Sequence, residues 1–101
     1  MEFPVITLCG STKYKEAFDK LLLELSLQGV VVLSLPVFSH HDNIELTEDN
    51  IKTLKEIQKQ KIDMSAGIFV ITKYGHIGDD TKEEIEYAKS KNKIIMYYYI
   101  E

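Results

Sequence analysis

The sequence predicts an α/β fold in which helices cover both faces of a short parallel sheet. Four apolar runs of strand length, several rich in β-branched residues, alternate with three segments whose apolar residues recur at helical spacing. This alternation is typical of a doubly wound layer fold with right-handed crossovers. No internal repeat or linker interrupts it, so we expect one domain over residues 1–101.

The first half of the chain contains two expected strands and one expected helix. Residues 4–9 form the first strand, and the helix that follows ends before Gly29, which is placed as a C′ glycine. The apolar stripe of this helix consists of Phe18, Leu21, Leu22 and Leu25. Residues 30–35 are almost wholly apolar, which predicts a parallel strand covered on both faces. We expect residues 36–45 to form a loop.

The second half continues the alternation. A second helix begins at Thr47 and runs to about Met64, and residues 68–72 form the third strand. The inward face of this helix is expected to hold Ile51, Leu54 and Ile57. A glycine-containing loop leads to a third helix over residues 81–90, whose buried face carries Ile85 and Ala88. Residues 93–100 form the fourth strand.

The composition disfavours several classes of function. The chain is 45% hydrophobic and 28% charged, with a net charge of −4, as in ordinary globular proteins. No apolar run approaches the ~20 residues that span a bilayer, and the start lacks a basic signal segment. We therefore expect a cytoplasmic protein with no membrane partner. Every basic residue is Lys and the balance is acidic, which disfavours nucleic-acid binding.

The cysteine and histidine content disfavours a metal site. Cys9 is the only cysteine, so the chain can form neither an internal disulfide nor a multi-cysteine zinc site. The adjacent His40 and His41 point in different directions, and no further ligands accompany them. We expect both histidines in a solvated or substrate-facing loop, and we expect no metal or organic cofactor.

The turn after the first strand is a candidate ligand site. Gly10, Ser11 and Thr12 stand where a strand gives way to a helix. Backbone amides converge at such a turn, and a glycine lets an anionic ligand approach closely. Alternatively, Ser11 or Thr12 only caps the first helix.

The second candidate is the segment 78–88, which follows the third strand and opens a helix. In open parallel sheets, ligands bind in the crevice beyond the carboxyl ends of the strands, and Glu84 can point there. However, Thr81 and Glu84 also have the spacing of a capping box, which would turn Glu84 back onto its own helix. Asp63, near the end of the second helix, either faces the crevice or is an ordinary polar residue.

Three successive tyrosines, Tyr97 to Tyr99, alternate across the last strand, so each face of the sheet carries an aromatic side chain. They either pack against the flanking helices or form a dimer surface, where Tyr is favoured.

The segments Ile6–Thr12 and Thr81–Ala88 together resemble the nucleoside 2-deoxyribosyltransferase superfamily, which includes the deoxynucleoside-monophosphate N-glycosidases. The resemblance covers nearly the whole chain. It implies a flavodoxin-like or Rossmann-like three-layer sandwich with a short, mainly parallel sheet of about four strands. It also implies a homo-oligomer, because active sites of this family often borrow residues from a neighbouring subunit.

The same resemblance implies an activity and a role for each matching residue. Glu84 would attack the anomeric carbon of a nucleoside or its 5′-monophosphate, and water or a second base would resolve the glycosyl ester. Asp63 or Asp79 would help to protonate the departing base. The implied substrate-binding residues are Cys9, Gly10, Ser11, Thr12, His40, His41, Gly78 and Thr81.

Three positions depart from the pattern of that family. Gly67 stands where relatives carry an Asp that leads the third strand, and Gly78 stands where an Asp precedes the nucleophile by six residues. Glu86 replaces a glycine two residues after the nucleophile. The alternative to an enzyme is therefore a nucleotide-binding module that has lost turnover, and a third option is an oligomeric structural protein that binds no nucleotide.

Overall fold

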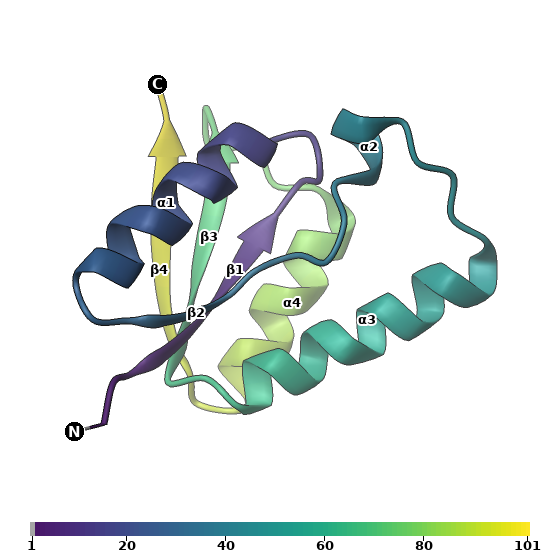
Figure 1. The fold of residues 1–101 in the computed structure, drawn as a ribbon. Coiled ribbons are helices and arrows are strands. Elements are labelled where there is room, and N and C mark those ends of the chain that lie inside the picture. The colour runs from purple at the N-terminus through teal and green to yellow at the C-terminus, as the bar shows by residue number, and fades with distance from the viewer. Residues whose placement is uncertain (1) are drawn as a thin grey trace.

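The computed structural model of the chain describes residues 2–101 and contains a sheet of four parallel strands (Figure 1). The strands are β1 (Val5–Gly10), β2 (Val31–Leu33), β3 (Gly67–Lys73) and β4 (Ile94–Ile100). Their order across the sheet is β2-β1-β3-β4. This is the order of the first strands of flavodoxin-like folds, so the predicted fold class is confirmed.

Four helices accompany the sheet: α1 (Lys15–Leu27), α2 (Ser39–Asp42), α3 (Glu48–Asp63) and α4 (Asp79–Ser90). The helix α1 covers one face of the sheet, and α3 and α4 cover the other (Figure 1). The short helix α2 lies beyond the end of β1. The molecule therefore has three layers.

The alternation of side chains along the strands divides the core into two halves. On β1, Leu8 packs under α1, while its neighbour Cys9 packs under α3 and α4. The first half-core contains the buried residues Leu8, Phe18, Leu21, Leu25, Phe38 and Ile71. The second contains Cys9, Ile62, Ile68, Val70, Ile85 and Ala88. The predicted apolar faces of the first and third helices are thus confirmed.

The run 30–35 does not form a strand covered on both faces. Only Val31–Leu33 is strand, and Val31 remains 45% exposed because β2 lies at the edge of the sheet. The following segment, expected to be a loop, contains the helical turn α2.

The predicted inward face of α3 is partly wrong. Ile51 and Ile57 are each 42% exposed, whereas Gln58 and Ile62 are buried. The first turns of α3 extend beyond the sheet (Figure 1), so only the later turns have a sheet to pack against.

The helix α4 begins at Asp79, before the predicted start at Thr81. Gly78 is its N-cap residue, and Asp79 and Asp80 occupy the first turn, where negative charge is favourable. Thr81 consequently lies inside the helix and is buried. Within residues 2–101, no helix is both long enough and apolar enough to cross a membrane.

Candidate functional site

A cavity of about 340 Å³ lies beyond the carboxyl end of β1, between α2, α3 and α4. Its polar wall contains Thr12, Ser39, His40, Lys55, Gln58, Lys59, Asp80, Glu83 and Glu84. Its apolar wall contains Leu35, Pro36, Val37, Ile44, Leu46, Ile51 and Leu54. The cavity therefore occupies the crevice position that parallel α/β sheets use for ligands.

The end of β1 forms the floor of this cavity through Gly10. Its φ of +149° disfavours other residues, and a Cβ built there would lie 2.7 Å from the carbonyl oxygen of Ile71. The alternative that Ser11 or Thr12 caps α1 is wrong: Tyr14 is the N-cap residue, and no side chain caps the helix. Instead, Ser11 Oγ accepts a hydrogen bond from the backbone N–H of Lys13 at 3.2 Å. Thr12 is thus left to contact α2.

Glu84 points across to α3 and does not cap its own helix. No side-chain cap exists at the start of α4, so the capping-box alternative for Thr81 and Glu84 is wrong. The carboxylate is partly buried, and its Oε1 accepts a hydrogen bond from Gln58 Nε2 at 2.9 Å. Glu84 therefore forms part of the cavity wall, as the segment 78–88 suggested.

Gln58 anchors this arrangement and was not identified from the sequence. Its side chain is 7% exposed, and Nε2 also donates to the carbonyl oxygen of Leu8 at 3.0 Å and contacts Cys9 Sγ at 3.6 Å. One amide thus ties β1 to the carboxylate on α4. A signal was present, because Leu54, Gln58 and Ile62 follow helical spacing and Gln58 is the polar member of that stripe.

Burial sets the ionisation of the carboxylate. Loss of solvent raises the pKa of Glu84, and the negative charges of Asp80 and Glu83 raise it further. Hydrogen bonds from Gln58 and Cys9 act in the opposite direction and favour the charged form. Burial and the neighbouring Glu84 raise the pKa of Cys9 well above its usual value, so Cys9 remains a neutral thiol.

Lys55 joins α3 to α4 at the mouth of the cavity. Its Nζ lies 3.2 Å from Asp80 Oδ1, and that carboxylate raises the pKa of Lys55. Both side chains are exposed, so this ion pair contributes little to stability. Its importance lies in placing one cation and one further carboxylate on the cavity wall.

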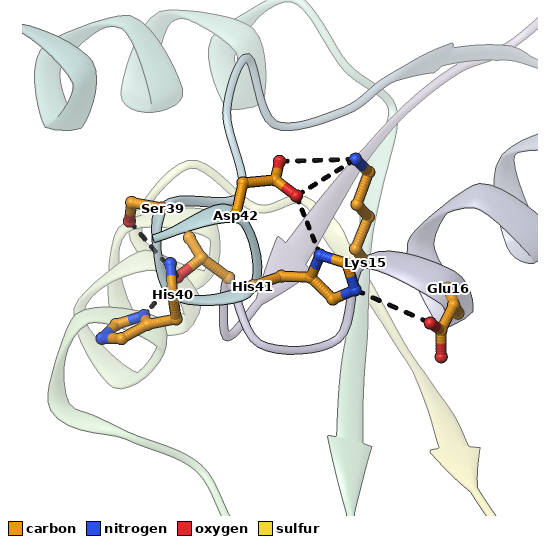
Figure 2. A network of polar contacts seen from close by, with 7 residues as sticks. Lys15, Glu16, Ser39, His40, His41 and Asp42 are labelled. Carbon is orange, nitrogen blue, oxygen red and sulfur yellow. Dashed lines mark hydrogen bonds and ion pairs between the residues drawn. The ribbon is translucent and has the colours of Figure 1, made fainter. Parts of the chain in front are cut away.

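The two adjacent histidines point in different directions, as predicted (Figure 2). His40 lines the cavity and contacts the hydroxyl of Thr12, to which its own backbone N–H also donates at 3.3 Å. Ser39 Oγ reaches the same hydroxyl at 3.5 Å. Thr12 therefore fastens α2 over the cavity.

His41 belongs to a cluster of charged groups outside the cavity (Figure 2). Its Nδ1 lies 2.8 Å from Asp42, and its Nε2 lies 3.6 Å from Glu16. Lys15 Nζ pairs with Asp42 at 3.3 Å. The hydrogen bond with Asp42 raises the pKa of His41, and the same bond lowers the pKa of Asp42. In the described part of the chain, no three His, Cys, Asp or Glu residues are grouped to hold a metal ion.

The other sequence candidates are not brought to the cavity. Asp63 ends α3 and accepts a hydrogen bond from the Tyr87 hydroxyl, with oxygen–oxygen distances of 2.7 and 2.8 Å. Asp79 is absent from the cavity wall, where its neighbour Asp80 stands instead. The remaining candidates that do not line the cavity are Cys9, Ser11, His41, Gly78 and Thr81.

Gly67 also lies away from the cavity. It starts β3 in register with Ile6, whereas Gly10 is in register with Ile71, about 13 Å further along the strand. A Cβ at Gly67 would lie 2.6 Å from the carbonyl oxygen of Ile94. An Asp at this position would therefore clash with β4 unless that strand shifted.

The fold is shared with a solved 2-desoxiribosyltransferase. No protein-family model matches the sequence, and no match is found among curated proteins. Among solved structures, a 2-desoxiribosyltransferase from Leishmania mexicana matches with a TM-score of 0.71 and 14% sequence identity. The match covers 97% of this chain and 65% of the Leishmania chain, so this chain spans less than two thirds of that protein's length. At this identity, the likeness shows a common fold.

Proposed function

We propose that this chain cleaves or transfers the N-glycosidic bond of a nucleoside or deoxynucleoside, or of its 5′-monophosphate, through a covalent ester on Glu84. Two observations support this function. A carboxylate lines a cavity at the carboxyl edge of a parallel sheet, and a buried amide holds it there. The fold is that of a solved 2-desoxiribosyltransferase.

The first step is attack of the Glu84 carboxylate on the anomeric carbon. The C–N bond breaks, the base leaves with the bonding electron pair, and the sugar becomes an ester of Glu84. Gln58 binds Oε1 of this carboxylate. Water or a second base then displaces the ester oxygen, which gives hydrolysis or transfer respectively.

Asp80 is the proposed acid/base in place of Asp63 and Asp79. It lines the cavity four residues before Glu84 on α4, and side chains at that spacing share one face of a helix. Its negative charge is one of the groups that raise the pKa of Glu84. Asp80 would protonate the departing base and deprotonate the incoming water or base.

The two walls of the cavity suit the two parts of a nucleoside. Gly10, Thr12 and His40 supply backbone and polar groups for the sugar and its 5′ substituent. Leu35, Ile44 and other apolar side chains face them and offer a surface for the planar base. The hydrogen bond from Gln58 to Glu84 carries the proposal, because it holds in place a carboxylate that lines this space.

Base release tests this function directly. The protein is incubated with each nucleoside, each deoxynucleoside and their 5′-monophosphates, and free base is measured by chromatography. We expect release with at least one of them, loss of release in Glu84→Gln, and retention in the control Glu86→Gln, which changes an exposed carboxylate on the same helix. No release with any substrate at high protein concentration contradicts the proposal.

A nucleotide-binding module without turnover is the second candidate. It is favoured by one observation: the group bonded to Glu84 is the amide of Gln58, which cannot donate a proton as an acid does. This candidate predicts that calorimetry detects nucleotide binding, that Glu84→Ala leaves the affinity unchanged, and that no base is released.

A further inference from the structure

The side-chain carbonyl oxygen of Gln58 makes no hydrogen bond within residues 2–101. The other end of the same amide, Nε2, lies 3.0 Å from the carbonyl oxygen of Leu8 and 2.9 Å from Oε1 of Glu84. A peptide carbonyl can only accept a hydrogen bond, and so can an ionised carboxylate. The nitrogen must therefore face these two oxygens, and this requirement fixes where the carbonyl oxygen of the amide stands.

This carbonyl oxygen is an acceptor on the wall of the cavity. In the described part of the chain, every buried side-chain nitrogen or oxygen has a hydrogen-bond partner. The carbonyl oxygen of Gln58 has none, so it is not one of the buried atoms and solvent reaches it. The side chain as a whole is only 7% exposed, and it lines the cavity. The open acceptor therefore belongs to the cavity and stands beside Glu84.

An acceptor in this position discriminates between ligands. A ligand that fills the cavity displaces the water that solvates the carbonyl oxygen. If the ligand brings no donor to that point, the oxygen is left unpaired, which costs binding free energy. A ligand with a hydroxyl or N–H group there replaces the lost hydrogen bond. Gln58 thus favours a ligand that has a donor next to the group bound by Glu84.

Stereochemistry indicates which donor this is. In the proposed reaction, Glu84 attacks the anomeric carbon from the face of the sugar opposite the base. In a ribonucleoside, the 2′-hydroxyl lies on that face and on the neighbouring carbon, whereas a 2′-deoxynucleoside has only hydrogen there. The amide of Gln58 is bonded to the attacking carboxylate, so it lies on the side of the sugar where the 2′-hydroxyl is found.

We propose that Gln58 binds the substrate directly, through a hydrogen bond from the 2′-hydroxyl to its side-chain carbonyl oxygen, and that the site therefore prefers ribonucleosides to 2′-deoxynucleosides. This inference rests on the proposed function, because attack by Glu84 sets the orientation of the sugar. The Leishmania protein is named as a 2-desoxiribosyltransferase, so this preference would distinguish the chain from its structural neighbour.

Binding of analogues that are not cleaved tests the preference without turnover. In these nucleosides a methylene group replaces the ring oxygen, so they cannot form an oxocarbenium-like transition state and they keep their base. Matched analogues carrying each common base are compared by calorimetry. We expect the ribo form to bind with a Kd roughly three- to tenfold lower than that of the 2′-deoxy form. The arabino form, whose 2′-hydroxyl lies on the opposite face, should bind no better than the 2′-deoxy form.

Variants of Gln58 test the origin of the preference. Gln58→Lys keeps a donor for Leu8 and Glu84 but has no acceptor, and Gln58→Met has neither. The ratio of the ribo and 2′-deoxy Kd values should fall to about one in both variants. This ratio cancels any general loss of affinity. The matched control is Gln60→Met, which changes an exposed glutamine on the same helix and should keep the wild-type ratio.

Each possible result supports or overturns the inference. Equal Kd values for the ribo and 2′-deoxy forms in wild type, or a ratio that is unchanged in both Gln58 variants, overturn it and leave the proposed function standing. Binding of no analogue at all overturns it together with the proposed function. A wild-type preference that is lost in Gln58→Lys and Gln58→Met and kept in Gln60→Met supports it.

Discussion

Gln58 Nε2 donates a 2.9 Å hydrogen bond to Glu84 Oε1 and thereby connects α3 to α4 across the cavity. The same nitrogen donates to the Leu8 carbonyl oxygen, so the carboxylate is fixed relative to the end of β1. The amide also favours the charged form of a carboxylate whose pKa burial raises. The hydrogen bond therefore holds the Glu84 carboxylate in place and favours its ionised form.

Removing the amide should shift the pH dependence of base release. The hydrogen bond lowers the pKa of Glu84, so Gln58→Leu should raise that pKa and move the acidic limb of kcat/KM to higher pH. The control is Gln60→Leu, which changes an exposed glutamine on the same helix. An acidic limb at the same pH in Gln58→Leu and wild type would show that the bond does not control the ionisation of Glu84.

Neutralising Glu84 should stabilise the protein at neutral pH. The pKa of Glu84 is raised in the folded state, so the protein is most stable when Glu84 is protonated. Its stability falls as pH rises from the ordinary pKa of Glu, about 4.3, to the pKa of Glu84 in the folded protein. Glu84→Gln should therefore melt at a higher temperature than wild type near pH 7, and this gain should disappear in acid. A melting temperature equal to or below that of wild type at pH 7 would argue against a buried, destabilised carboxylate. Glu86→Gln is the control.

Ionisation of His41 should depend on Asp42. The hydrogen bond with Asp42 raises the pKa of His41 above 6.5, so Asp42→Asn should lower it, as measured by NMR titration of the imidazole. The contact stabilises the folded protein below the ordinary pKa of His. This stabilisation is lost as pH rises through the pKa of His41 in the folded protein. The control is Asp49→Asn, which removes a carboxylate in the first turn of α3 and leaves the contacts of His41 with Asp42 and Glu16 in place. An unchanged His41 titration in Asp42→Asn would contradict the contact.

Asp63→Asn should leave base release unchanged. Asp63 contributes to structure through its hydrogen bond with Tyr87, so losing that bond should lower the free energy of unfolding slightly, because the site is exposed. Denaturant unfolding of Asp63→Asn, Tyr87→Phe and the double variant measures the coupling of the pair. A large fall in kcat for Asp63→Asn would restore it as an acid/base candidate.

The layered architecture was predictable because each local pattern agrees with the global fold. The apolar runs are short and separated by amphipathic segments, and Gly29 ends α1 where expected, with a left-handed φ of +85°. The edge position of β2 could not be read from its apolar composition, because strand order depends on contacts between distant segments. The exposure of Val31 is a consequence of that order.

Helical geometry explains why Asp80, which the sequence analysis did not select, shares the cavity with Glu84 while the predicted Asp79 and Asp63 do not. Asp80 and Glu84 are four residues apart and share a face, whereas Asp79 is five residues from Glu84 and lies about 140° away around the helix. The same angle separates Asp63 from Gln58 on α3, which places Asp63 away from the cavity. Gln58 was missed because its role depends on its hydrogen bond with Glu84 on α4, and the sequence pattern does not show that these two helices meet.

Intact-protein mass spectrometry of the reaction with the best substrate tests the central claim most directly. Quenching during turnover should trap a protein heavier by one sugar unit, and peptide mapping should place that mass on Glu84. The adduct should be absent from Glu84→Gln and present in Glu86→Gln. Base release at the wild-type rate with no adduct, or with the adduct on another residue, would contradict a covalent role for Glu84.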